Sequence, residues 1–600
     1  MALKDTLLPF TAWQNITRDP VTVKDPLNDR PGAERYRGFH KNDIEKCIGC
    51  GTCEEICPNA AIDLVPVEGV ETKDGDSGLR PKIDYGRCCW CGFCVDICTT
   101  NSLTLSNEYK WIDEDPDNFR FIPGVDKKSW DNEEKGWKKP GNNYKLYNPE
   151  RVKMKELHPE ERDKSFIEII QGYSKQQALA EADRCVECGI CTATCPAHMG
   201  IPEYIKAIRN DDMEEGLRIL YDTNPLPEIC GRICTHKCET VCSVGHTGDP
   251  ISIRWLKRYI ADQNPSDKFK EILGTDTIEQ NGKKVAIIGS GPSGLSAAHY
   301  LALMGYSCTI FEKLPLAGGM MRYGIPEYRL PYDQIDKDID YILSLGVDIK
   351  YNTIIGKDIT LEQLNKDFDA VFSGTGLHLG RSTRIPGTEH KDVYFATDLL
   401  REISLGKEIP VEKKVVVIGG GNVAMDITRS IARLQNQKYG EVNVIATSLE
   451  SEDIMPADRE EIVEGREELA KIIPGWGPVD IKIEDDKVKG LNVVKCMSVF
   501  DESGRFNPKF NEEIKDFFEA DMVIESIGQG MDLSYFSDSI KENIKMDNRG
   551  RIIVDNYFQS SLDWLFVGGD MIQGPDVIHG IENGHKAAIG IDNFINQKKK

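Results

Sequence analysis

The amino-acid sequence predicts an α/β protein with two nested Rossmann-like nucleotide-binding domains, preceded by a helical domain and an α+β domain that both carry cysteine motifs. Three observations lead to this fold class. A strand, a glycine-rich turn and a helix follow one another twice, after Lys284 and after Lys414. All but two of the 19 cysteines lie between Cys47 and Cys242. The 600 residues suffice for roughly three to five domains with separate cores.

The composition is that of a globular protein, and its charge limits the partners. Of the residues, 40% are hydrophobic and 29% are charged, and the net charge is −24. This excess of acidic residues argues against nucleic acid or an anionic membrane surface as the partner. No apolar run approaches the roughly 18 residues of a membrane span, and the N-terminus lacks the layout of a signal peptide. We therefore expect a cytoplasmic protein, in which clustered cysteines bind metal rather than form disulfides.

The first two cysteine motifs have the spacing of a bacterial ferredoxin with two clusters. Each has the form C-x2-C-x2-C-x3-C, in which the fourth cysteine of each copy ligates the other cluster. Two tandem sets of four are unusual for zinc, and Cys89 is out of register. We predict a ferredoxin domain at residues 41–106, after an extended arm (1–40) and before a linker (107–148) that packs against a neighbouring domain or subunit. The expected [4Fe–4S] ligand sets are Cys47, Cys50, Cys53 and Cys98, and Cys57, Cys88, Cys91 and Cys94.

Two further sets of four cysteines belong to a helical iron–sulfur domain predicted at residues 149–275. A helical segment over 159–185 leads into a motif that again has ferredoxin-like spacing. The second set recurs at every fourth position, a spacing that suits one helical face or a folded cluster loop. The polar neighbours His236, Lys237 and Glu239 argue against an apolar helical face. Two more [4Fe–4S] clusters are expected, with the ligand pairing left open among Cys185, Cys188, Cys191, Cys195, Cys230, Cys234, Cys238 and Cys242.

The first glycine-rich turn predicts a dinucleotide site. Strand Val285–Ile288 runs into a G-x-G-x-x-G turn, helix Leu295–Met304 follows, and a second strand ends at Glu312. The glycines allow a tight turn, backbone contact with a pyrophosphate and close helix packing, while Glu312 meets a ribose hydroxyl. A glycine-rich loop at 317–326 and a strand, turn and helix at 565–589 complete the expected site. Its predicted contacts are Gly289, Gly291, Pro292, Ser293, Gly294, Glu312, Gly319, Met320, Arg322, Gly376, Gly569, Asp570 and Val577.

The second glycine-rich turn has the same layout with alanine at its third position, so it also predicts a nucleotide site. It lies within the sequence of the first nucleotide-binding domain. Two units nested in this way are typical of flavoprotein reductases, in which the outer unit binds FAD and the inner one a nicotinamide nucleotide. We therefore predict an FAD domain at 280–410 and 526–600 and an NAD(P) domain at 411–525. The expected inner contacts are Gly419, Gly421, Asn422, Val423, Ala424 and Asp426.

Several sequence blocks within residues 150–600 resemble the small (β) subunit of bacterial glutamate synthase, among them NPLPEICGRIC, VAIIGSGPSGLSAAHYL, AGGMMRYGIPEYRLP, VVVIGGGNVAMD and MPADREE. A similar module occurs in the NADPH-binding subunit of the bifurcating transhydrogenase and in the N-terminal half of dihydropyrimidine dehydrogenase. Residues 40–105 look like a ferredoxin module fused in front. The resemblance implies two [4Fe–4S] clusters in the helical domain, FAD in the outer domain and NADPH in the inner one. It also implies hydride transfer to the flavin, and release of single electrons through the clusters to a partner.

The chain departs from that family at two places that bear on function. Family members often use a glutamate or glutamine as one cluster ligand, where this chain has Lys257, which cannot ligate iron as a cation; Cys230 is the expected replacement. The family also carries paired arginines that bind the 2′-phosphate of NADPH, and here the corresponding stretch is 446–450, Ala-Thr-Ser-Leu-Glu. Loss of the guanidinium donors favours NADH, although Arg429 or Arg459 could replace them.

The predicted function is that of an oxidoreductase subunit. It passes electrons between NAD(P)H, FAD and four [4Fe–4S] clusters, and then to ferredoxin or to further redox subunits of a larger complex. The sequence shows no nucleophile–base pair or acid–base dyad of its own. Electron bifurcation is one form that this function could take. Two alternatives stay open: a glutamate synthase small subunit proper, which would not need the fused ferredoxin domain, and a non-catalytic scaffold or assembly subunit, which would not need intact glycine turns.

Overall fold

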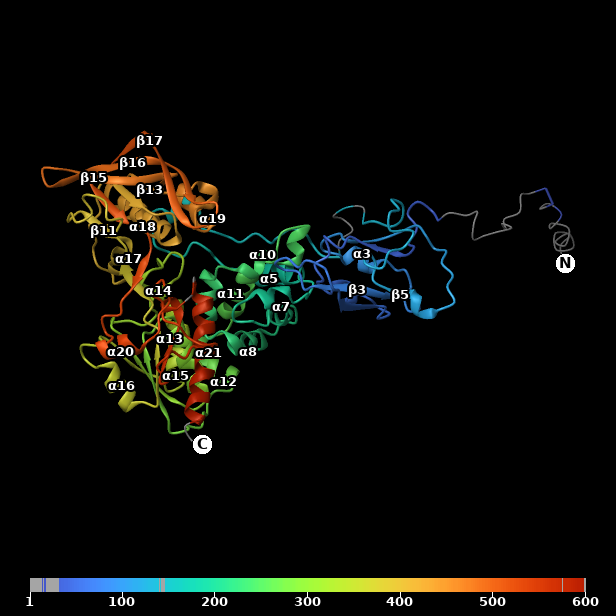
Figure 1. Cartoon of the computed structure of the whole chain (residues 1–600), viewed down its shortest axis with the longest axis horizontal. Helices are drawn as coiled ribbons and strands as arrows, with labels where there is room; N and C mark the ends of the chain where they lie inside the picture. Colours follow the sequence, from blue (N-terminus) through green and yellow to red (C-terminus); the bar gives the residue numbers. More distant parts are fainter. Residues whose placement is uncertain are drawn as a thin grey trace. The chain divides into compact units, whose positions relative to one another are not determined.

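Figure 1 shows the computed structural model of the chain, and the residues that it describes are 13, 16–17, 32–139, 141, 146–572, 574 and 576–597. Most of the predicted N-terminal arm, residues 1–40, lies outside these ranges. Contacts between residues divide the chain into two units. The first unit contains the ferredoxin domain and the segments 183–191 and 240–251, and the second contains the other helices and both nucleotide-binding domains.

The ferredoxin domain repeats one short motif twice. In each copy a glycine follows the second cysteine in the left-handed conformation, Gly51 at φ 81° and Gly92 at φ 85°, and a short helix begins directly after it. Two small antiparallel sheets cover these loops, one of β1 and β4 and one of β2, β3 and β5. The elements are β1 (His40–Asn42), α2 (Thr52–Glu55), β2 (Ile62–Pro66), β3 (Leu79–Asp84), α3 (Phe93–Ile97), β4 (Leu103–Leu105), η2 (Pro116–Phe119) and β5 (Arg120–Phe121).

The segment after the second motif packs on the ferredoxin domain. Strand β5 pairs with β3, so that Phe121 lies opposite Ile83. Trp130 is 4% exposed and stacks on Phe39 with ring centroids 4.5 Å apart. Trp111 packs against the same hydrophobic core. The stretch predicted as a linker at 107–148 therefore contributes, in its described part, a strand and aromatic side chains to the ferredoxin core.

Short helices build the helical domain. Helices α9 and α11 pack so closely that a Cβ atom on Gly231 would lie only 2.8 Å from the Cα atom of Arg258. This contact places Cys230 and Lys257, one residue before each, at the same helix interface. The helices are α6 (Ile190–Thr194), α7 (Ile201–Arg209), α8 (Met213–Thr223), α9 (Pro227–Ile233), α10 (Lys237–Thr240), α11 (Ile253–Gln263) and α12 (Phe269–Leu273).

The continuous helical segment predicted over 159–185 is wrong in its middle. Helix α4 (Pro159–Arg162) and helix α5 (Lys175–Ala182) are separated by non-helical chain. Within that chain Ile170 forms an antiparallel bridge with Glu156, and Gly172 has a φ of 79°, which a right-handed helix cannot accommodate. The tertiary bridge and the glycine therefore override the helical propensity of the flanking residues.

The outer nucleotide-binding domain has a parallel sheet in the order β20-β9-β6-β7-β8. Helices α13 and α21 lie side by side (Figure 1), and a Cβ on Gly584 of α21 would lie 2.3 Å from the Ser293 carbonyl oxygen. The C-terminal strand β20 thus lies in the same sheet as β6. The elements are β6 (Lys284–Ile288), α13 (Pro292–Leu303), β7 (Ser307–Phe311), α14 (Met320–Tyr323), α15 (Tyr332–Ser344), β8 (Asp348–Lys350), α16 (Leu361–Asp367), β9 (Ala370–Ser373), β20 (Leu565–Val567), η7 (Gly569–Met571) and α21 (Val577–Gln597).

The inner nucleotide-binding domain has a second parallel sheet, in the order β11-β18-β12-β13-β14. Strand β11 (Val393–Phe395) pairs with β18, and α17 (Ala396–Ser404) packs in the inner core. Both lie in the range 280–410 that the sequence assigned to the FAD domain, so the inner domain begins earlier than that boundary. The other elements are β12 (Val415–Ile418), α18 (Asn422–Tyr439), β13 (Val444–Ser448), η6 (Glu452–Ile454), α19 (Arg459–Glu467), β14 (Lys471–Pro474) and β18 (Met522–Glu525). The predicted fold class of two nested Rossmann-like domains is confirmed.

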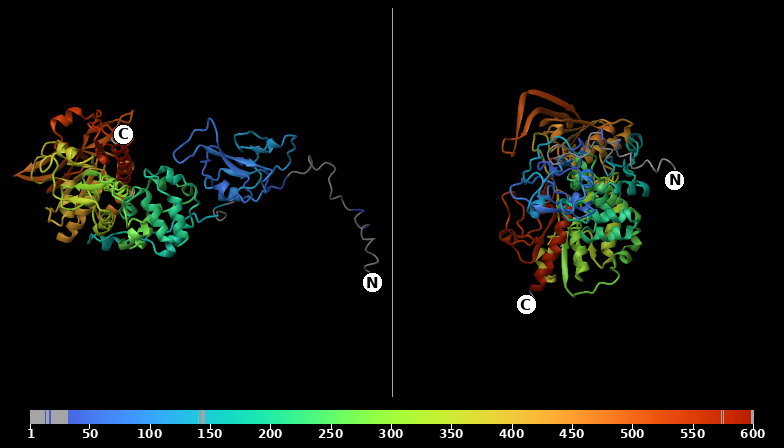
Figure 2. Two further views of the ribbon diagram at one scale, coloured as in Figure 1. Left: turned by 90° about the horizontal axis from the view of Figure 1, so that it is seen from below. Right: turned by 90° about the vertical axis from the view of Figure 1, so that its right-hand side faces the viewer.

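A three-stranded antiparallel sheet extends the inner domain and is visible as the long orange strands in Figure 2. It consists of β15 (Trp476–Glu484), β16 (Lys487–Phe500) and β17 (Phe506–Glu519). Trp476 begins β15 and packs against Phe518. A small two-stranded sheet of β10 (Leu377–Gly380) and β19 (Gln529–Met531) pairs the two chain segments that enter and leave the inner domain.

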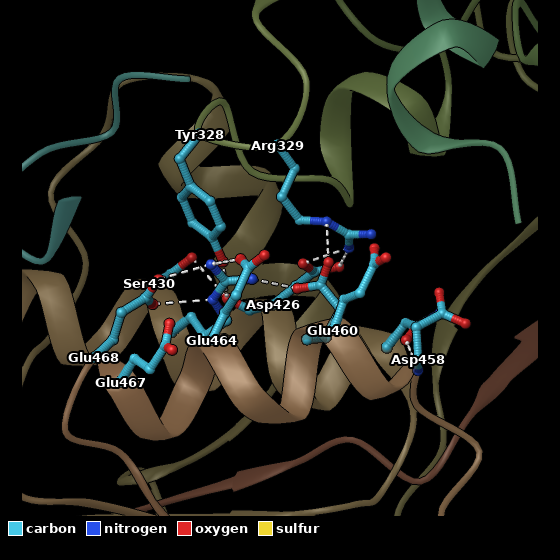
Figure 3. A network of polar contacts seen from close by, with 12 residues as sticks. Tyr328, Arg329, Asp426, Ser430, Asp458, Glu460, Glu464, Glu467 and Glu468 are labelled. Carbon is cyan, nitrogen blue, oxygen red and sulfur yellow. Dashed lines mark hydrogen bonds and ion pairs between the residues drawn. The ribbon is translucent and has the colours of Figure 1, made fainter. Parts of the chain in front are cut away.

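A buried network of ion pairs joins the inner domain to the segment before α15 (Figure 3). Glu468 is fully buried and accepts hydrogen bonds from Arg429, at 2.7 and 2.9 Å, and from Arg433, at 2.6 and 2.9 Å. The Arg433 guanidinium lies 3.7 Å from the ring centroid of Tyr328. The neighbouring Arg329 pairs with Asp426 of α18 at 2.7 Å. Charges from both domains therefore balance one another away from solvent.

Candidate functional site

One continuous pocket of about 330 Å³ runs along the first glycine-rich turn and reaches the N-terminus of α18. Its volume falls within the range of roughly 300–1,000 Å³ that is usual for small-molecule sites. The pocket lies at the carboxyl ends of the parallel strands, which is where open α/β sheets bind ligands. The predicted site residues that line it are Gly289, Gly291, Pro292, Ser293, Glu312, Gly319, Met320, Gly376, Asn422, Val423, Asp426, Gly569, Asp570 and Val577.

The three glycines of the outer turn differ in their surroundings as the sequence predicts. A Cβ on Gly294 would lie 2.0 Å from the Gly289 carbonyl oxygen, so only glycine permits this helix to pack so close to the turn. Gly289 turns the chain with a φ of 92°. Gly291 has no atom within 4 Å of a Cβ position, which leaves its backbone open to a ligand. Gly291 is also the N-cap of α13 and forms no side-chain cap, so the helix N–H groups are free to bind a pyrophosphate.

Glu312 is fixed at the end of β7 by hydrogen bonds from its surroundings. Its Oε2 atom accepts from the Ser290 N–H at 2.9 Å and from the Ser290 hydroxyl at 2.6 Å. Its Oε1 atom accepts from the Leu314 N–H at 2.9 Å. The carboxylate lines the pocket and retains lone pairs. It is therefore placed to accept a hydrogen bond from a ribose hydroxyl.

Five predicted contacts do not line this pocket. Arg322 donates to the Ala317 carbonyl oxygen at 2.6 Å and pairs with Asp336, so its side chain is held by the protein. Ala424 is fully buried and packs against the inner turn. The full set consists of Gly294, Arg322, Gly419, Gly421 and Ala424. Gly294, Gly419 and Ala424 keep the roles of turning and close packing, Gly421 lies open at the start of α18, and Arg322 has a structural role.

The inner turn repeats the outer arrangement. A Cβ on Gly421 would meet nothing within 4 Å, and Gly421 is the N-cap of α18 without a side-chain cap. Asn422 exchanges hydrogen bonds with Asp458, whose N–H donates to the Asn422 side-chain oxygen at 2.8 Å. Next to this turn, a Cβ on Gly420 would lie 3.1 Å from the Glu450 Oε2 atom. An acidic side chain therefore borders the inner phosphate-binding turn.

Arg429 and Arg459, which the sequence offered as replacements for the family's paired arginines, differ in their burial. Arg429 is fully buried and donates to Glu461, Glu464 and Glu468, so the idea that it binds a nucleotide phosphate is wrong. Arg459 has a side chain that is 65% exposed and pairs with Glu452 at 2.7 Å. Burial and neighbouring carboxylates thus remove Arg429 from the site, while Arg459 stays close to solvent.

Several pocket residues were missed by the sequence interpretation. The Tyr535 hydroxyl shares hydrogen bonds with Ser373 at 2.9 Å and Thr375 at 3.3 Å, and burial raises the pKa of Tyr535 to about 12. Burial lowers the pKa of His378 to about 4, so this imidazole is neutral. These side chains come from segments distant in sequence that meet only in the folded domain, and no motif marks them. Other missed pocket residues are Thr235, Arg329, Gln529, Asp532 and Asp576.

The buried Asp570 carboxyl group in this pocket should make the stability of the protein depend on pH. Burial, and then the nearby Asp576, raise the pKa of Asp570 to about 6. The folded state disfavours the ionised form of the Asp570 carboxyl group. Its ionisation therefore lowers the free energy of unfolding by roughly 3 kcal/mol above about pH 6 and has no effect below about pH 4. We expect Asp570→Asn to raise the unfolding midpoint of FAD-free protein at pH 8 and to leave it unchanged at pH 4. The exposed Asp563→Asn serves as the control; equal midpoints for Asp570→Asn and wild type at pH 8 would contradict this account.

The ferredoxin cysteines gather into the two predicted sets. A small cavity is lined by Cys47, Cys50, Cys53 and Cys98. Cys88 and Cys94 interact electrostatically with Cys57 and Cys91. The fourth cysteine of each motif thus joins the other motif, as the two-cluster spacing requires.

The cysteines of the helical domain also fall into two groups, one in each unit. In the second unit, Lys257 is buried among four thiol groups: burial lowers its pKa, but the thiolates raise it above the ordinary value. These thiols are Cys234, Cys230, Cys195 and Cys238. In the first unit, burial raises the pKa of Cys242, with Cys188 as the neighbouring thiol. The Cys188 Sγ atom and the Ser243 hydroxyl are 3.2 Å apart.

These thiols suit iron–sulfur clusters better than single metal ions. Burial raises the pKa of Cys50 and of Cys88 to about 11, so a bound metal is needed to keep them as thiolates. Within the described part of the chain, no three Cys, His, Asp or Glu side chains converge to hold one ion. In a four-iron cube each thiolate binds a different iron, so its ligands surround a cavity instead.

A dinucleotide pocket between two glycine-rich turns, together with ferredoxin-type cysteine sets, defines an iron–sulfur oxidoreductase of the flavin and nicotinamide type. Comparison with known families agrees with this class. Residues 283–588 match the pyridine nucleotide-disulphide oxidoreductase family, residues 162–269 match dihydropyrimidine dehydrogenase domain II with its 4Fe-4S cluster, and residues 46–102 match the 4Fe-4S dicluster domain.

Individual relatives place the chain within that family. The beta subunit of NADP(+)-dependent formate dehydrogenase from Moorella thermoacetica is 37% identical over 68% of this chain and 60% of the relative. The beta subunit of NADPH-Fe(3+) oxidoreductase from Geobacter sulfurreducens is 37% identical over 68% and 64%. The small chain of NADPH glutamate synthase from Escherichia coli is 32% identical over 72% and 94%.

The chain belongs to the pyridine nucleotide-disulphide oxidoreductase family, in the group that includes the glutamate synthase small chain. It carries 4Fe-4S domains ahead of the nucleotide-binding domains. The chain spans less than two thirds of the length of the first two relatives. Among the described residues, no helix has both the length and the apolar composition that crossing a bilayer requires.

Proposed function

We propose that this chain is an electron-transfer subunit that oxidises or forms a nicotinamide nucleotide at FAD and exchanges single electrons through four [4Fe–4S] clusters. One observation carries the proposal: Ile233 and Thr235, which flank Cys234, line the same pocket as the outer glycine turn. The Thr235 hydroxyl donates to Asp576 at 2.9 Å, and Asp576 also accepts from the N–H of His579 at 3.1 Å. A cysteine of the second unit's cluster set is thereby fixed at the flavin pocket.

The residues of the chain account for binding and orientation in this reaction. The free N–H groups at the starts of α13 and α18 bind the pyrophosphates of the two dinucleotides, and Glu312 binds a ribose of FAD. FAD supplies the conversion between hydride transfer and single-electron transfer that iron–sulfur clusters require. Because Asn422, Val423 and Asp426 line the same pocket as Gly291, the two dinucleotide sites are continuous.

For the nicotinamide nucleotide, we propose NADH in preference to NADPH. The names of the relatives include NADP or NADPH, but in this chain the stretch that corresponds to the family's paired arginines, residues 446–450, reads Ala-Thr-Ser-Leu-Glu. The Glu450 carboxylate next to Gly420 would repel a 2′-phosphate and can accept a hydrogen bond from a free 2′-hydroxyl. The absence of arginine from residues 446–450, at the end of β13 and directly after it, is the reason for the proposed preference.

The proposed ligand sets also give an order for the clusters. The set of Cys195, Cys230, Cys234 and Cys238 adjoins the flavin pocket, and Cys191 in the same sequence motif belongs to the next set with Cys185, Cys188 and Cys242. In the first unit, Cys188 interacts electrostatically with Cys50 of a ferredoxin set. Electrons would leave from the ferredoxin domain to ferredoxin or to further redox subunits. Electron bifurcation at the flavin would use the same route.

The alternatives make different predictions from those of this proposal. Anaerobically purified protein should carry on the order of 16 iron atoms per chain, from four cubes of four, and one FAD. It should also reduce a viologen dye faster with NADH than with NADPH. Colourless protein without flavin would support a scaffold role instead. Isolation of the native complex with a glutamate synthase large subunit would support a small subunit of that enzyme.

A further inference from the structure

We propose that His40 sets the reduction potential of the second ferredoxin cluster by donating a hydrogen bond from Nε2–H to the Sγ atom of Cys94. The inference rests on the proposed ligand set of Cys57, Cys88, Cys91 and Cys94. His40 is the first residue of β1 and is 2% exposed. Its Nε2 atom lies 3.3 Å from Cys94 Sγ, and its Nδ1 atom lies 3.0 Å from the Tyr85 hydroxyl oxygen.

The hydrogen bonds around Tyr85 decide which ring nitrogen of His40 carries the proton. The Tyr85 oxygen already accepts the backbone N–H of His40 at 2.9 Å. The hydroxyl has one hydrogen of its own, and Nδ1 of His40 is an acceptor within reach. If Tyr85 donates to Nδ1, the neutral imidazole must carry its hydrogen on Nε2.

The opposite tautomer of His40 would be unfavourable at both ring nitrogens. With the hydrogen on Nδ1, the Tyr85 oxygen would accept twice while its own hydrogen would lose the Nδ1 acceptor, and the residue is only 6% exposed. The lone pair of Nε2 would then face the negatively charged Cys94 thiolate. Both effects favour the Nε2–H tautomer. Tyr85 is held in place for this by stacking on Phe121, with ring centroids 5.0 Å apart.

An N–H hydrogen bond to a cluster thiolate stabilises the reduced cluster, because reduction adds negative charge to the sulfur atoms. The Nε2 atom lies within hydrogen-bond distance of Cys94, the third cysteine of its motif. The equivalent cysteine of the other motif is Cys53, whose thiol is influenced by burial and by the neighbouring thiols of Cys50, Cys94, Cys98 and Cys47 rather than by a hydrogen bond. His40 thus acts as a positioning residue for the thiolate. It makes one of two similar motifs chemically distinct.

The test compares His40→Leu, His40→Gln and Tyr85→Phe in the anaerobic full-length protein by redox titration monitored by EPR. For His40→Leu we expect the potential of one ferredoxin cluster to fall by at least the equivalent of a tenfold change in equilibrium constant, about 59 mV for one electron. Tyr85→Phe, which frees the tautomer but keeps the ring, should give a smaller fall. His40→Gln, which keeps an N–H donor, should restore part of the potential.

A second measurement separates hydrogen bonding from mere packing. Protein labelled with ¹⁵N-histidine should show a weak nitrogen coupling to the reduced cluster in pulsed EPR, and His40→Leu should abolish it. His299→Leu is the matched control, because His299 is also buried, at 1% exposed, but belongs to the other unit. Full iron content with an unchanged potential in His40→Leu would overturn the role of His40 alone. Wild-type protein without the ferredoxin iron would instead overturn the proposed ligand set.

Discussion

Replacement of Cys234 by alanine should leave flavin reduction by NADH intact but strongly slow the transfer of electrons from the flavin to the clusters. Cys234 lies between two residues that line the flavin pocket, and it belongs to the cysteine set around Lys257. Without this cluster we expect about four fewer iron atoms per chain. Cluster reduction should slow by roughly 100-fold or more, because the flavin loses its nearest single-electron acceptor. Stopped-flow absorbance would record the flavin and the clusters separately.

Cys89→Ser is the matched control for this experiment. Cys89 is exposed and stands outside both ferredoxin sets, so its removal should change neither the iron content nor the rate. If Cys234→Ala retained all of its iron and passed electrons to the clusters at the wild-type rate, the proposed route from the pocket would be wrong. If flavin reduction itself were lost, the variant would report a damaged pocket, and Thr235→Val would test the route without removing a ligand.

The double substitution Leu449→Arg and Glu450→Arg should reverse the nucleotide preference. It removes a carboxylate beside the inner turn and adds two guanidinium groups that can bind a 2′-phosphate. Hydrogen bonds to charged groups contribute about 1.5–3 kcal/mol each, so we expect the ratio of kcat/KM for NADPH to that for NADH to rise by about 100-fold. Steady-state viologen reduction with both nucleotides gives this ratio.

The control must reproduce the change in charge without touching the nucleotide site. Glu513→Arg with Ile514→Arg makes the same change of charge on β17, where both side chains are exposed. It should leave the ratio unchanged. A wild-type protein that already prefers NADPH would contradict the proposed role of Glu450, and Arg459 would then be the next residue to test because its side chain is 65% exposed near the same turn.

The sequence predicts best those parts of the site that are determined locally. The tasks predicted for Gly289, Gly291 and Gly294 follow from a turn of six residues, and the backbone has the geometry that these tasks need: a turn at Gly289, open space at Gly291 and close packing at Gly294. The spacing of the ferredoxin cysteines likewise predicts the two sets that the structure brings together. The nested Rossmann-like architecture follows from the order of these motifs along the chain. Local patterns therefore suffice for the fold class and for the glycine-rich turns along the pocket, while most of the other lining residues come from distant segments.

The parts that sequence could not give depend on contacts between distant segments. The grouping of Cys230 with Cys195 follows from the packing of α9 on α11, which no spacing rule contains. Arg429 looked available for a phosphate, but three glutamates of the α19 region bury it. The break in the helix predicted over 159–185 comes from a bridge to Glu156 and from Gly172.

The buried ion pairs between the inner domain and the segment at Tyr328 also constrain how this chain can change in evolution. Removing one partner of a buried pair leaves the other charge uncompensated and typically costs about 3–5 kcal/mol. Glu468 by itself pairs with three arginines, Arg162, Arg429 and Arg433. Single substitutions in this network are therefore expected to be purged, and only coordinated changes survive. The residues that fix the relative placement of the two nucleotide sites are thus expected to change only together. The surface residues that determine the nucleotide preference can change one at a time.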